Sequence, residues 1–312
     1  MNYYLAPMEG ITTYIYRNAY NKYFGGIDKY FTPFIASKKM NNRELNDILP
    51  DHNQGMNVVP QILTNRADEF LQITHKLTEY GYTTVNLNLG CPSGTVTARK
   101  RGAGFLSVPD ELDKFLYEIY EKSPIDISIK TRIGIDDLED WDYLLKIYSK
   151  YPISELIIHT RLQKEFYNGT PHKDPYKKAS KLLDIPLCYN GDINSLQSHK
   201  ELLDEIPDIN SIMIGRGLLQ NPSLIDIIEG RLSTDKTTLK SFHDEIFENY
   251  ASIMSGETNT LYKMKDLWTY LSKNFTESDK YLKKIRKSNS FSDYKTAVNS
   301  LFREQEIFIP KK

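Results

Sequence analysis

Eight short apolar segments recur in the first two thirds of this 312-residue chain, and most are followed by a stretch with helical periodicity. Strands that alternate with helices form parallel βαβ units. Eight such units predict an α/β fold closed into a (β/α)8 TIM barrel. The alternative is an open, Rossmann-like sheet, but no G-x-G-x-x-G motif follows the first strand. The expected strands are Tyr3–Ala6, Tyr30–Phe34, Asn57–Ile62, Thr83–Asn88, Asp126–Lys130, Glu155–His159, Pro186–Tyr189 and Ser211–Ile214.

The segments between these strands carry helix start and stop signals. After the second strand, however, the asparagine-rich stretch Asn41–Asn53 predicts a polar loop. The expected helices are Thr13–Phe24, Ala67–Tyr80, Asp110–Lys122, Trp141–Lys150, Tyr176–Leu183, Ser195–Leu203 and Pro222–Gly230.

The strand signal disappears at about Leu232, and the rest of the chain predicts a small all-helical domain. We expect helices at Leu239–Met254, Thr260–Phe275, Asp279–Lys287 and Asp293–Phe302. The predicted domains are therefore residues 1–232, the barrel, and residues 233–312, the helical domain.

Charge is distributed unevenly over these two parts. From residue 231 to the end there are 15 Lys and Arg against 11 Asp and Glu, although the whole chain has a net charge of −1. A basic helical region on an acidic body suggests a polyanionic partner. An ordinary solvated helical surface is the alternative.

Two cysteines, Cys91 and Cys188, provide no disulfide framework, so we expect a reducing, cytoplasmic setting. No apolar run is long enough for a membrane span, and no secretory signal is visible. The spacing of Cys and His residues predicts no metal site, and nothing points to an obligate protein partner.

The stretch Val85–Leu106 joins an apolar strand to Cys91 and then to a basic loop with two glycines. A strand that presents a thiol beside a glycine-rich loop is typical of a functional site. The alternative is a packed structural cysteine next to a solvated loop, and composition alone does not separate the two.

Polar residues follow nearly every predicted strand, where a barrel builds its active site. This coincidence predicts an enzyme. The glycine-containing turns around Gly191 and Gly215 suit a phosphate, to which Arg216 adds charge. Lys130 ends an apolar strand and needs a partner, which a flavin ring would supply, and Gln61 offers both a donor and an acceptor to a heterocycle.

Together these residues resemble the tRNA-dihydrouridine synthase family. The motifs occur in the family's order and cover roughly residues 3 to 220. They are A-P-M-E-G near the start, V-P-Q-I-L around Gln61, N-L-N-L-G-C-P around Cys91, G-A-G-F-L at Gly102–Leu106, I-K-T-R-I-G around Lys130, H-T-R at His159, Y-N-G at Tyr167–Gly169, Y-N-G-D-I at Tyr189 and I-G-R-G at Ile214.

The resemblance implies reduction of the C5–C6 double bond of specific uridines in tRNA, with FMN as cofactor and NADPH as its reductant. Cys91 would protonate C5 while C6 receives hydride. Asn88 would hold the base, Arg132 the nucleotide, and Arg99, Lys100 and Arg101 the RNA phosphates. The residues expected to contact FMN are Pro7, Met8, Glu9, Gln61, Lys130, His159, Asn190, Gly191, Asp192, Gly215 and Arg216.

A helical C-terminal domain is also expected of the family, and it would bind the tRNA body. Its densest basic run comprises Lys280, Lys283, Lys284, Arg286 and Lys287. Two other functions stay open. One is an FMN-dependent reductase of a free pyrimidine, and the other is a catalytically silent tRNA-binding protein.

Overall fold

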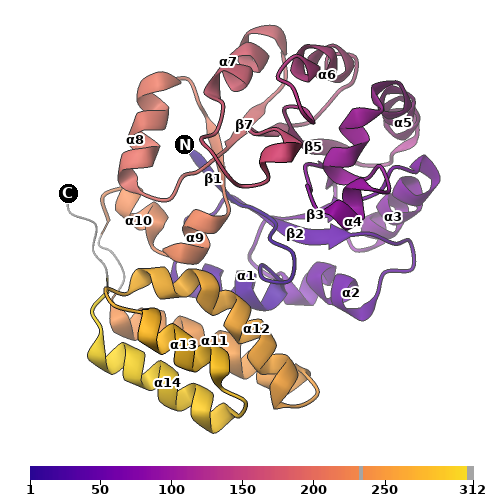
Figure 1. Cartoon of the computed structure of the whole chain (residues 1–312). Helices are drawn as coiled ribbons and strands as arrows, with labels where there is room; N and C mark the ends of the chain where they lie inside the picture. Colours follow the sequence, from indigo (N-terminus) through magenta and orange to yellow (C-terminus); the bar gives the residue numbers. More distant parts are fainter. Residues whose placement is uncertain (232–234, 308–312) are drawn as a thin grey trace. The chain divides into compact units, whose positions relative to one another are not determined.

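The computed structural model describes residues 1–231 and 235–307, and in this part eight parallel strands close into a barrel (Figure 1). Each strand pairs with the next in chain order, and β1 pairs with β8. The TIM barrel is therefore confirmed, because an open Rossmann-like sheet would leave these two strands unpaired. The strands are β1 Asn2–Leu5, β2 Lys29–Ile35, β3 Val58–Ile62, β4 Thr84–Leu89, β5 Asp126–Arg132, β6 Leu156–His159, β7 Leu187–Asn190 and β8 Ser211–Ile214.

Amphipathic helices connect the strands close to the predicted positions. These helices are α1 Tyr14–Tyr23, α3 Ala67–Glu79, α5 Pro109–Lys122, α6 Asp140–Tyr148, α7 Lys173–Leu182 and α8 Leu196–Glu205. Shorter elements that were not predicted are α4 Gly94–Thr97, α9 Arg216–Gln220 and the 3-10 turns η1 Pro50–His52, η2 Gly102–Ser107 and η3 Gln163–Glu165. A further 3-10 turn, η4 Ser272–Asn274, lies within the predicted helix Thr260–Phe275.

The predicted loop after β2 is wrong in part, because helix α2 forms at Asn42–Ile48. Its cap explains why a polar segment is helical. The Asn41 side chain accepts a hydrogen bond from the Glu44 backbone N–H at 3.0 Å, and the Glu44 carboxylate accepts one from the Asn41 N–H at 2.8 Å. This capping box satisfies two N–H groups at the helix start. The spacing of Asn41 and Glu44 was the available signal.

Apolar side chains fill the inside of the barrel, so it is a packed core and not a pore. One buried cluster contains Tyr4, Phe31, Val59, Cys188 and Met213. Cys188 is 0% exposed, and burial raises the pKa of its thiol well above the ordinary value. Cys188 is therefore a structural cysteine.

The chain divides into two compact units. The first unit contains all eight strands and comprises Met1–Pro7, Asp28–Asp192 and Leu203–Ile214. The second comprises Met8–Ile27, Ile193–Leu202 and Gly215–Lys312, so it joins α1 and α9 to the C-terminal helices. The predicted boundary between residues 232 and 233 lies outside the described residues and stays a prediction.

The second unit contains the predicted C-terminal helices. Helix α1 packs against α11 (Lys236–Ile253), where the rings of Tyr16 and Phe242 lie 5.6 Å apart. In the described part of the chain, no helix has the length and apolarity needed to cross a membrane. The helices after β8 and α9 are α10 Leu224–Ile228, α11 Lys236–Ile253, α12 Glu257–Leu271, α13 Asp279–Lys287 and α14 Phe291–Glu304.

A buried polar cluster joins three of these helices through the hydroxyl of Tyr294. Trp268 Nε1 donates to this oxygen at 2.8 Å, and His243 Nε2 lies 2.6 Å from it. All three side chains are buried, and burial lowers the pKa of His243. Tyr294 therefore satisfies two polar groups that have no access to water.

Replacing Tyr294 with phenylalanine is expected to lower the free energy of unfolding by about 1–3 kcal/mol, because it leaves the Trp268 N–H without an acceptor. Urea unfolding measures the change. The matched control is Tyr262→Phe on α12. Tyr262 is 67% exposed, so removing its hydroxyl should lower the free energy of unfolding by less than about 0.5 kcal/mol. Equal stability of the two variants would contradict this account.

Candidate active site

The register of the barrel strands brings the predicted polar residues side by side at the carboxyl ends. Gln61 on β3 pairs with Asn86 on β4, and Asn88 pairs with Lys130 on β5. Arg132 on β5 pairs with His159 on β6, which in turn pairs with Asn190 on β7. Five neighbouring strands of the first unit therefore carry amide, imidazole or cationic side chains at the end where TIM barrels place their active sites.

Amide side chains form a continuous buried chain across β3, β4 and β5. Gln61 Nε2 donates to Asn86 Oδ1 at 2.8 Å, and Asn86 Nδ2 donates to Ser128 Oγ at 2.9 Å. Asn88 Nδ2 donates to Gln61 Oε1 at 2.7 Å. These bonds fix which end of each amide is the donor. Gln61 keeps one N–H and one lone pair for a ligand.

Lys130 lies next to this chain, and burial lowers its pKa to about 8, with Arg132 as a second cause. Within the described residues its ammonium has no hydrogen-bond acceptor or ion-pair partner. A buried ammonium without a partner is costly. The position therefore fits a ligand that presents a carbonyl oxygen or an anionic ring, and a flavin presents both.

Arg161 is fully buried and holds the loop after β6. Its guanidinium forms a salt bridge with Asp192 at 2.5 Å and donates to the carbonyls of Asn168 and Gly169. The predicted phosphate role of Asp192 and Gly191 stays a prediction, and the structure shows that Asp192 is engaged by Arg161. Arg161 was part of a quoted motif, but the sequence did not indicate this role.

His159 has an assignable tautomer. Arg161 lies 3.4 Å from His159 Nε2 and can only donate, so Nε2 accepts and the proton sits on Nδ1. Tyr167, to which the sequence assigned no role, has its ring 6.2 Å from the His159 ring and 5.5 Å from the Arg132 guanidinium. Asn190 donates through Nδ2 to the Met213 carbonyl at 2.9 Å, which leaves its amide oxygen available.

The residues predicted to bind substrate differ in their surroundings. Asn88 is 7% exposed and Arg132 is 0% exposed. Arg101 bonds to Glu69 at 3.1 Å, and Lys100 pairs with Glu111 at 3.1 Å on the surface. Arg99 is exposed, and in the described part of the chain its guanidinium has no partner. Among the three basic loop residues, Arg99 is therefore the most available for a phosphate.

Four predicted cofactor residues belong to the second unit and follow β1 and β8 directly in the chain. Pro7 ends a segment of the first unit, and Met8 and Glu9 come next. The Met8 N–H donates to Thr12 Oγ1 at 2.8 Å, and Lys263 donates to the Gly10 carbonyl at 3.0 Å. Gly215 and Arg216 start α9. Their contacts with a cofactor stay a prediction.

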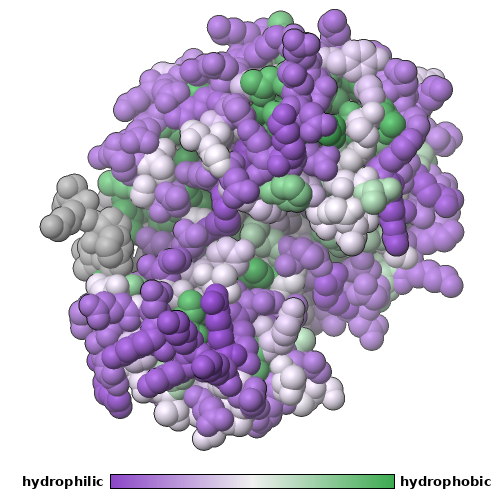
Figure 2. Space-filling view, in the orientation of Figure 1, coloured by the Kyte–Doolittle hydropathy of each residue, from purple (hydrophilic) through white to green (hydrophobic). Residues whose placement is uncertain are grey.

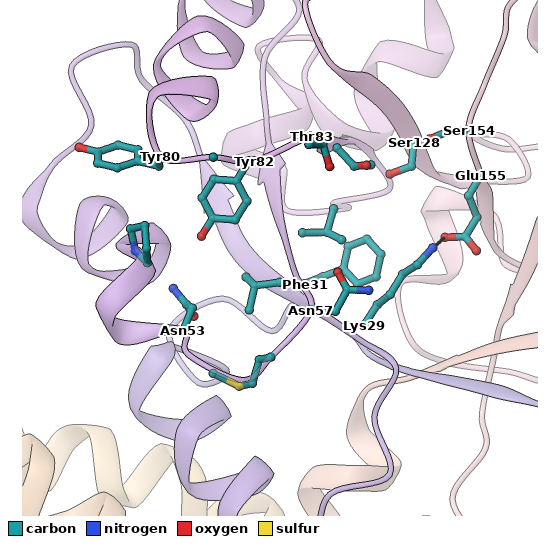
Figure 3. Close-up of a pocket in the computed structure, with 16 residues that line it drawn as sticks. Lys29, Phe31, Asn53, Asn57, Tyr80, Tyr82, Thr83, Ser128, Ser154 and Glu155 are labelled. Carbon is teal, nitrogen blue, oxygen red and sulfur yellow. Dashed lines mark hydrogen bonds and ion pairs between the residues drawn. The ribbon is translucent and has the colours of Figure 1, made fainter.

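A cavity of about 420 Å³ lies at the other end of the barrel, where the strands begin. Figure 3 shows Lys29 and Glu155 joined on one side of it and Tyr80 and Tyr82 on the other. The amino-terminal face of a TIM barrel contributes to stability, whereas catalysis occurs at the carboxyl ends. We therefore place the active site at the polar strand ends.

No group of three His, Cys, Asp or Glu side chains suited to a metal occurs among the described residues.

Known proteins resemble this chain over most of its length. The sequence model described as Dihydrouridine synthase (Dus) matches residues 4–309. tRNA-dihydrouridine synthase B of Pasteurella multocida is 30% identical over 241 residues, which are 76% of this chain and 71% of that protein. A probable tRNA-dihydrouridine synthase of Staphylococcus epidermidis is 28% identical over 257 residues, which are 79% of this chain and 78% of that protein.

Solved structures with a similar fold include morphinone reductase in complex with tetrahydroNAD, with a TM-score of 0.52 and 10% identity. The match covers 76% of this chain and 89% of that one. An old yellow enzyme homologue from Zymomonas mobilis has a TM-score of 0.52 and 12% identity, over 75% of this chain and 90% of that one. These likenesses concern the barrel fold.

Proposed function

Because the chain belongs to the dihydrouridine synthase family, as its motifs predict, we propose that it reduces the C5–C6 double bond of specific uridines in tRNA. The observation that carries the proposal is the pairing of strand ends in the first unit. Cys91 follows Asn88 at the end of β4. Asn88 lies beside Lys130 in the strand register, and the Lys130 ammonium has no acceptor among the described residues. The charge of a Cys91 thiolate would be close enough to raise the pKa of Lys130.

The described residues fit a flavin, because Lys130 lacks an acceptor and Gln61 keeps one free donor and one free acceptor. We propose FMN, with NADPH as reductant, and this cofactor supplies the hydride for C6 of uracil when bound. Lys130 and Gln61 would hold the polar edge of the ring. Asn190 presents its amide oxygen for a further hydrogen bond, and we propose that His159 also contacts the cofactor.

Cys91 would donate a proton to C5. An ordinary thiol has a pKa of about 8.5 and is mostly protonated at neutral pH, so it can act as a general acid. Neighbouring guanidinium groups would favour the thiolate and remove that proton. Two of the three basic residues of the following loop, Lys100 and Arg101, are each paired with a carboxylate. This pairing reduces their effect on the thiol.

We propose that the helices from residue 233 onward bind the tRNA body and that residues 1–232 form the catalytic domain. On α13, the side chains of Lys280, Lys283, Lys284, Arg286 and Lys287 are all exposed. Figure 2 shows a largely hydrophilic surface over α13 and α14. Such a cluster contacts RNA through phosphates.

The target uridine lies in folded RNA and must be turned out of its stack to reach the thiol. With tRNA as substrate, we propose that the reaction takes place in the cytoplasm.

Two measurements on the purified protein test the proposal. We expect a yellow preparation with a flavin absorption spectrum, and dihydrouridine formation in unmodified tRNA on addition of NADPH. A colourless protein that binds tRNA would support a silent binding protein instead. Equal reduction of free uridine would support a pyrimidine reductase, and either result contradicts the proposed function.

A further inference from the structure

Each backbone N–H and C=O group of Gly90 and Cys91 forms a hydrogen bond. Asn88 Oδ1 accepts hydrogen bonds from the N–H groups of Gly90, at 3.0 Å, and Cys91, at 2.9 Å. Arg132 Nε donates to the Gly90 carbonyl at 2.9 Å. The Ala103 N–H donates to the Cys91 carbonyl at 3.0 Å. The thiol therefore projects from a peptide segment with no freedom to rotate its amides.

Gly102 closes this segment from the other side. A Cβ atom at position 102 would lie 2.8 Å from the Cys91 carbonyl oxygen and 3.0 Å from Cys91 Cβ. The backbone there also has φ +56°, which glycine adopts readily. The chain can therefore fold tightly over Cys91 only because position 102 has no side chain.

The Asn88 amide has one allowed orientation. Its Nδ2 donates to Gln61 Oε1, and Gln61 is itself oriented by Asn86 and Ser128. Exchanging the oxygen and nitrogen of Asn88 would place an NH2 group against the two N–H donors of Gly90 and Cys91. The oxygen of Asn88 is thus committed to the cysteine backbone, and one N–H of its amide is already used.

Arg132, like Asn88, forms hydrogen bonds to the protein backbone. Its side chain is fully buried, and three of its nitrogens donate to the carbonyls of Gly90, Leu162 and Phe166, at 2.9, 2.8 and 2.6 Å. This guanidinium ties the start of the cysteine loop to the loop after β6. The geometry favours an anchoring role over a direct contact with a nucleotide.

We propose that Asn88 is a positioning residue that holds the Cys91 thiol in one place for proton transfer, with Arg132 as the second anchor of the same segment. This inference rests on the proposed function, because the role of Cys91 as proton donor comes from it. The alternative is that Asn88 acts by holding the uracil. The two roles predict different behaviour of the protein without RNA. Only the positioning role requires Asn88 to protect the Gly90 and Cys91 amides from exchange.

Hydrogen exchange of the flavin-bound protein without tRNA separates them, followed by mass spectrometry of peptides that cover residues 88–94. In Asn88→Ala the Gly90 and Cys91 amides should exchange about 10-fold faster, as expected for the loss of one net hydrogen bond. In Asn88→Asp one carboxyl oxygen still accepts both N–H groups, and the other, protonated at this buried position, can donate to Gln61 Oε1, so protection should be retained. Asn65→Ala is the matched control, because Asn65 donates to the Arg99 carbonyl of the same loop and not to residues 90 and 91.

Turnover on tRNA gives the second readout. Displacing the thiol in Asn88→Ala should lower kcat about 100-fold, with little change in KM for tRNA, and Asn88→Asp should restore much of kcat. Unchanged exchange in Asn88→Ala with a raised KM would overturn the proposal in favour of base holding. If the alanine variant does not fold, loss of protection in Asn88→Asp overturns the proposal, and retained protection with turnover supports it. Absence of dihydrouridine formation by the unmodified enzyme would instead overturn the proposed function.

Discussion

Replacing Cys91 with alanine is expected to leave the flavin absorption spectrum intact and to lower dihydrouridine formation by at least about 100-fold. General acid catalysis by a placed side chain contributes on the order of 10²–10⁴-fold to a rate. The only other cysteine, Cys188, is buried inside the barrel and has no route to a substrate. Nucleoside analysis of tRNA after single-turnover reaction with the reduced enzyme measures the effect.

Two further variants control this experiment. Cys91→Ser keeps a hydroxyl, which is a much weaker acid than a thiol, so it should also be slow. Cys188→Ala should keep turnover while it lowers the free energy of unfolding by about 1 kcal/mol, because it removes a sulfur from the core. Normal dihydrouridine formation by Cys91→Ala would exclude Cys91 as the proton donor.

Replacing Lys130 with methionine is expected to weaken FMN binding and, at neutral pH, to stabilise the flavin-free protein. Burial lowers the pKa of Lys130 to about 8 from the ordinary 10.5. Between these two pH values the unfolded chain binds more protons than the native protein does. The stability of the unmodified flavin-free protein should therefore rise with pH across this window, and the penalty for the charged lysine is fully present below pH 8.

The increase in the free energy of unfolding caused by Lys130→Met follows from the same difference between the native and the unfolded pKa of Lys130. It should reach about 1–3 kcal/mol at pH 7 and disappear as the pH approaches 10.5. Urea unfolding of the flavin-free proteins at several pH values measures it, and quenching of FMN fluorescence measures cofactor affinity. Lys146→Met on the exposed face of α6 is the control and should change neither quantity. Unchanged FMN affinity in Lys130→Met would remove Lys130 from the proposed cofactor site.

The barrel could be predicted from the sequence because its signals are local. Apolar runs such as Ser211–Ile214 and the helix α13 at Asp279–Lys287 match the structure to the residue. Helix α2 was missed because its composition is polar, and only the capping pair Asn41 and Glu44 marks it. Local periodicity cannot show helices that depend on a cap instead of an apolar face.

The gathering of polar residues at the strand ends could also be predicted, since the carboxyl ends of the strands converge in any parallel barrel. The hydrogen bonds within the site could not. Substrate contact by Asn88 and Arg132 stays a prediction, and the structure shows that both residues bond to the backbone of the cysteine loop. Asn88 also donates to Gln61 on β3, and Arg132 also donates to two carbonyls of the loop after β6. The partners lie far apart in the chain, because Arg132 and Gly90 are separated by 42 positions and Asn88 and Gln61 by 27.

The sequence by itself thus determined the eightfold alternation, the residues at the strand ends and the family. Each of these depends on side-chain order along the chain, which sets periodicity and motif spacing. Only the tertiary structure decided which of those residues are buried and to what they are bonded. Strand register brings distant residues together in a space that excludes water. It forms the hydrogen-bonded chain from Ser128 to Asn88, and it buries the Lys130 ammonium where the described residues offer it no acceptor.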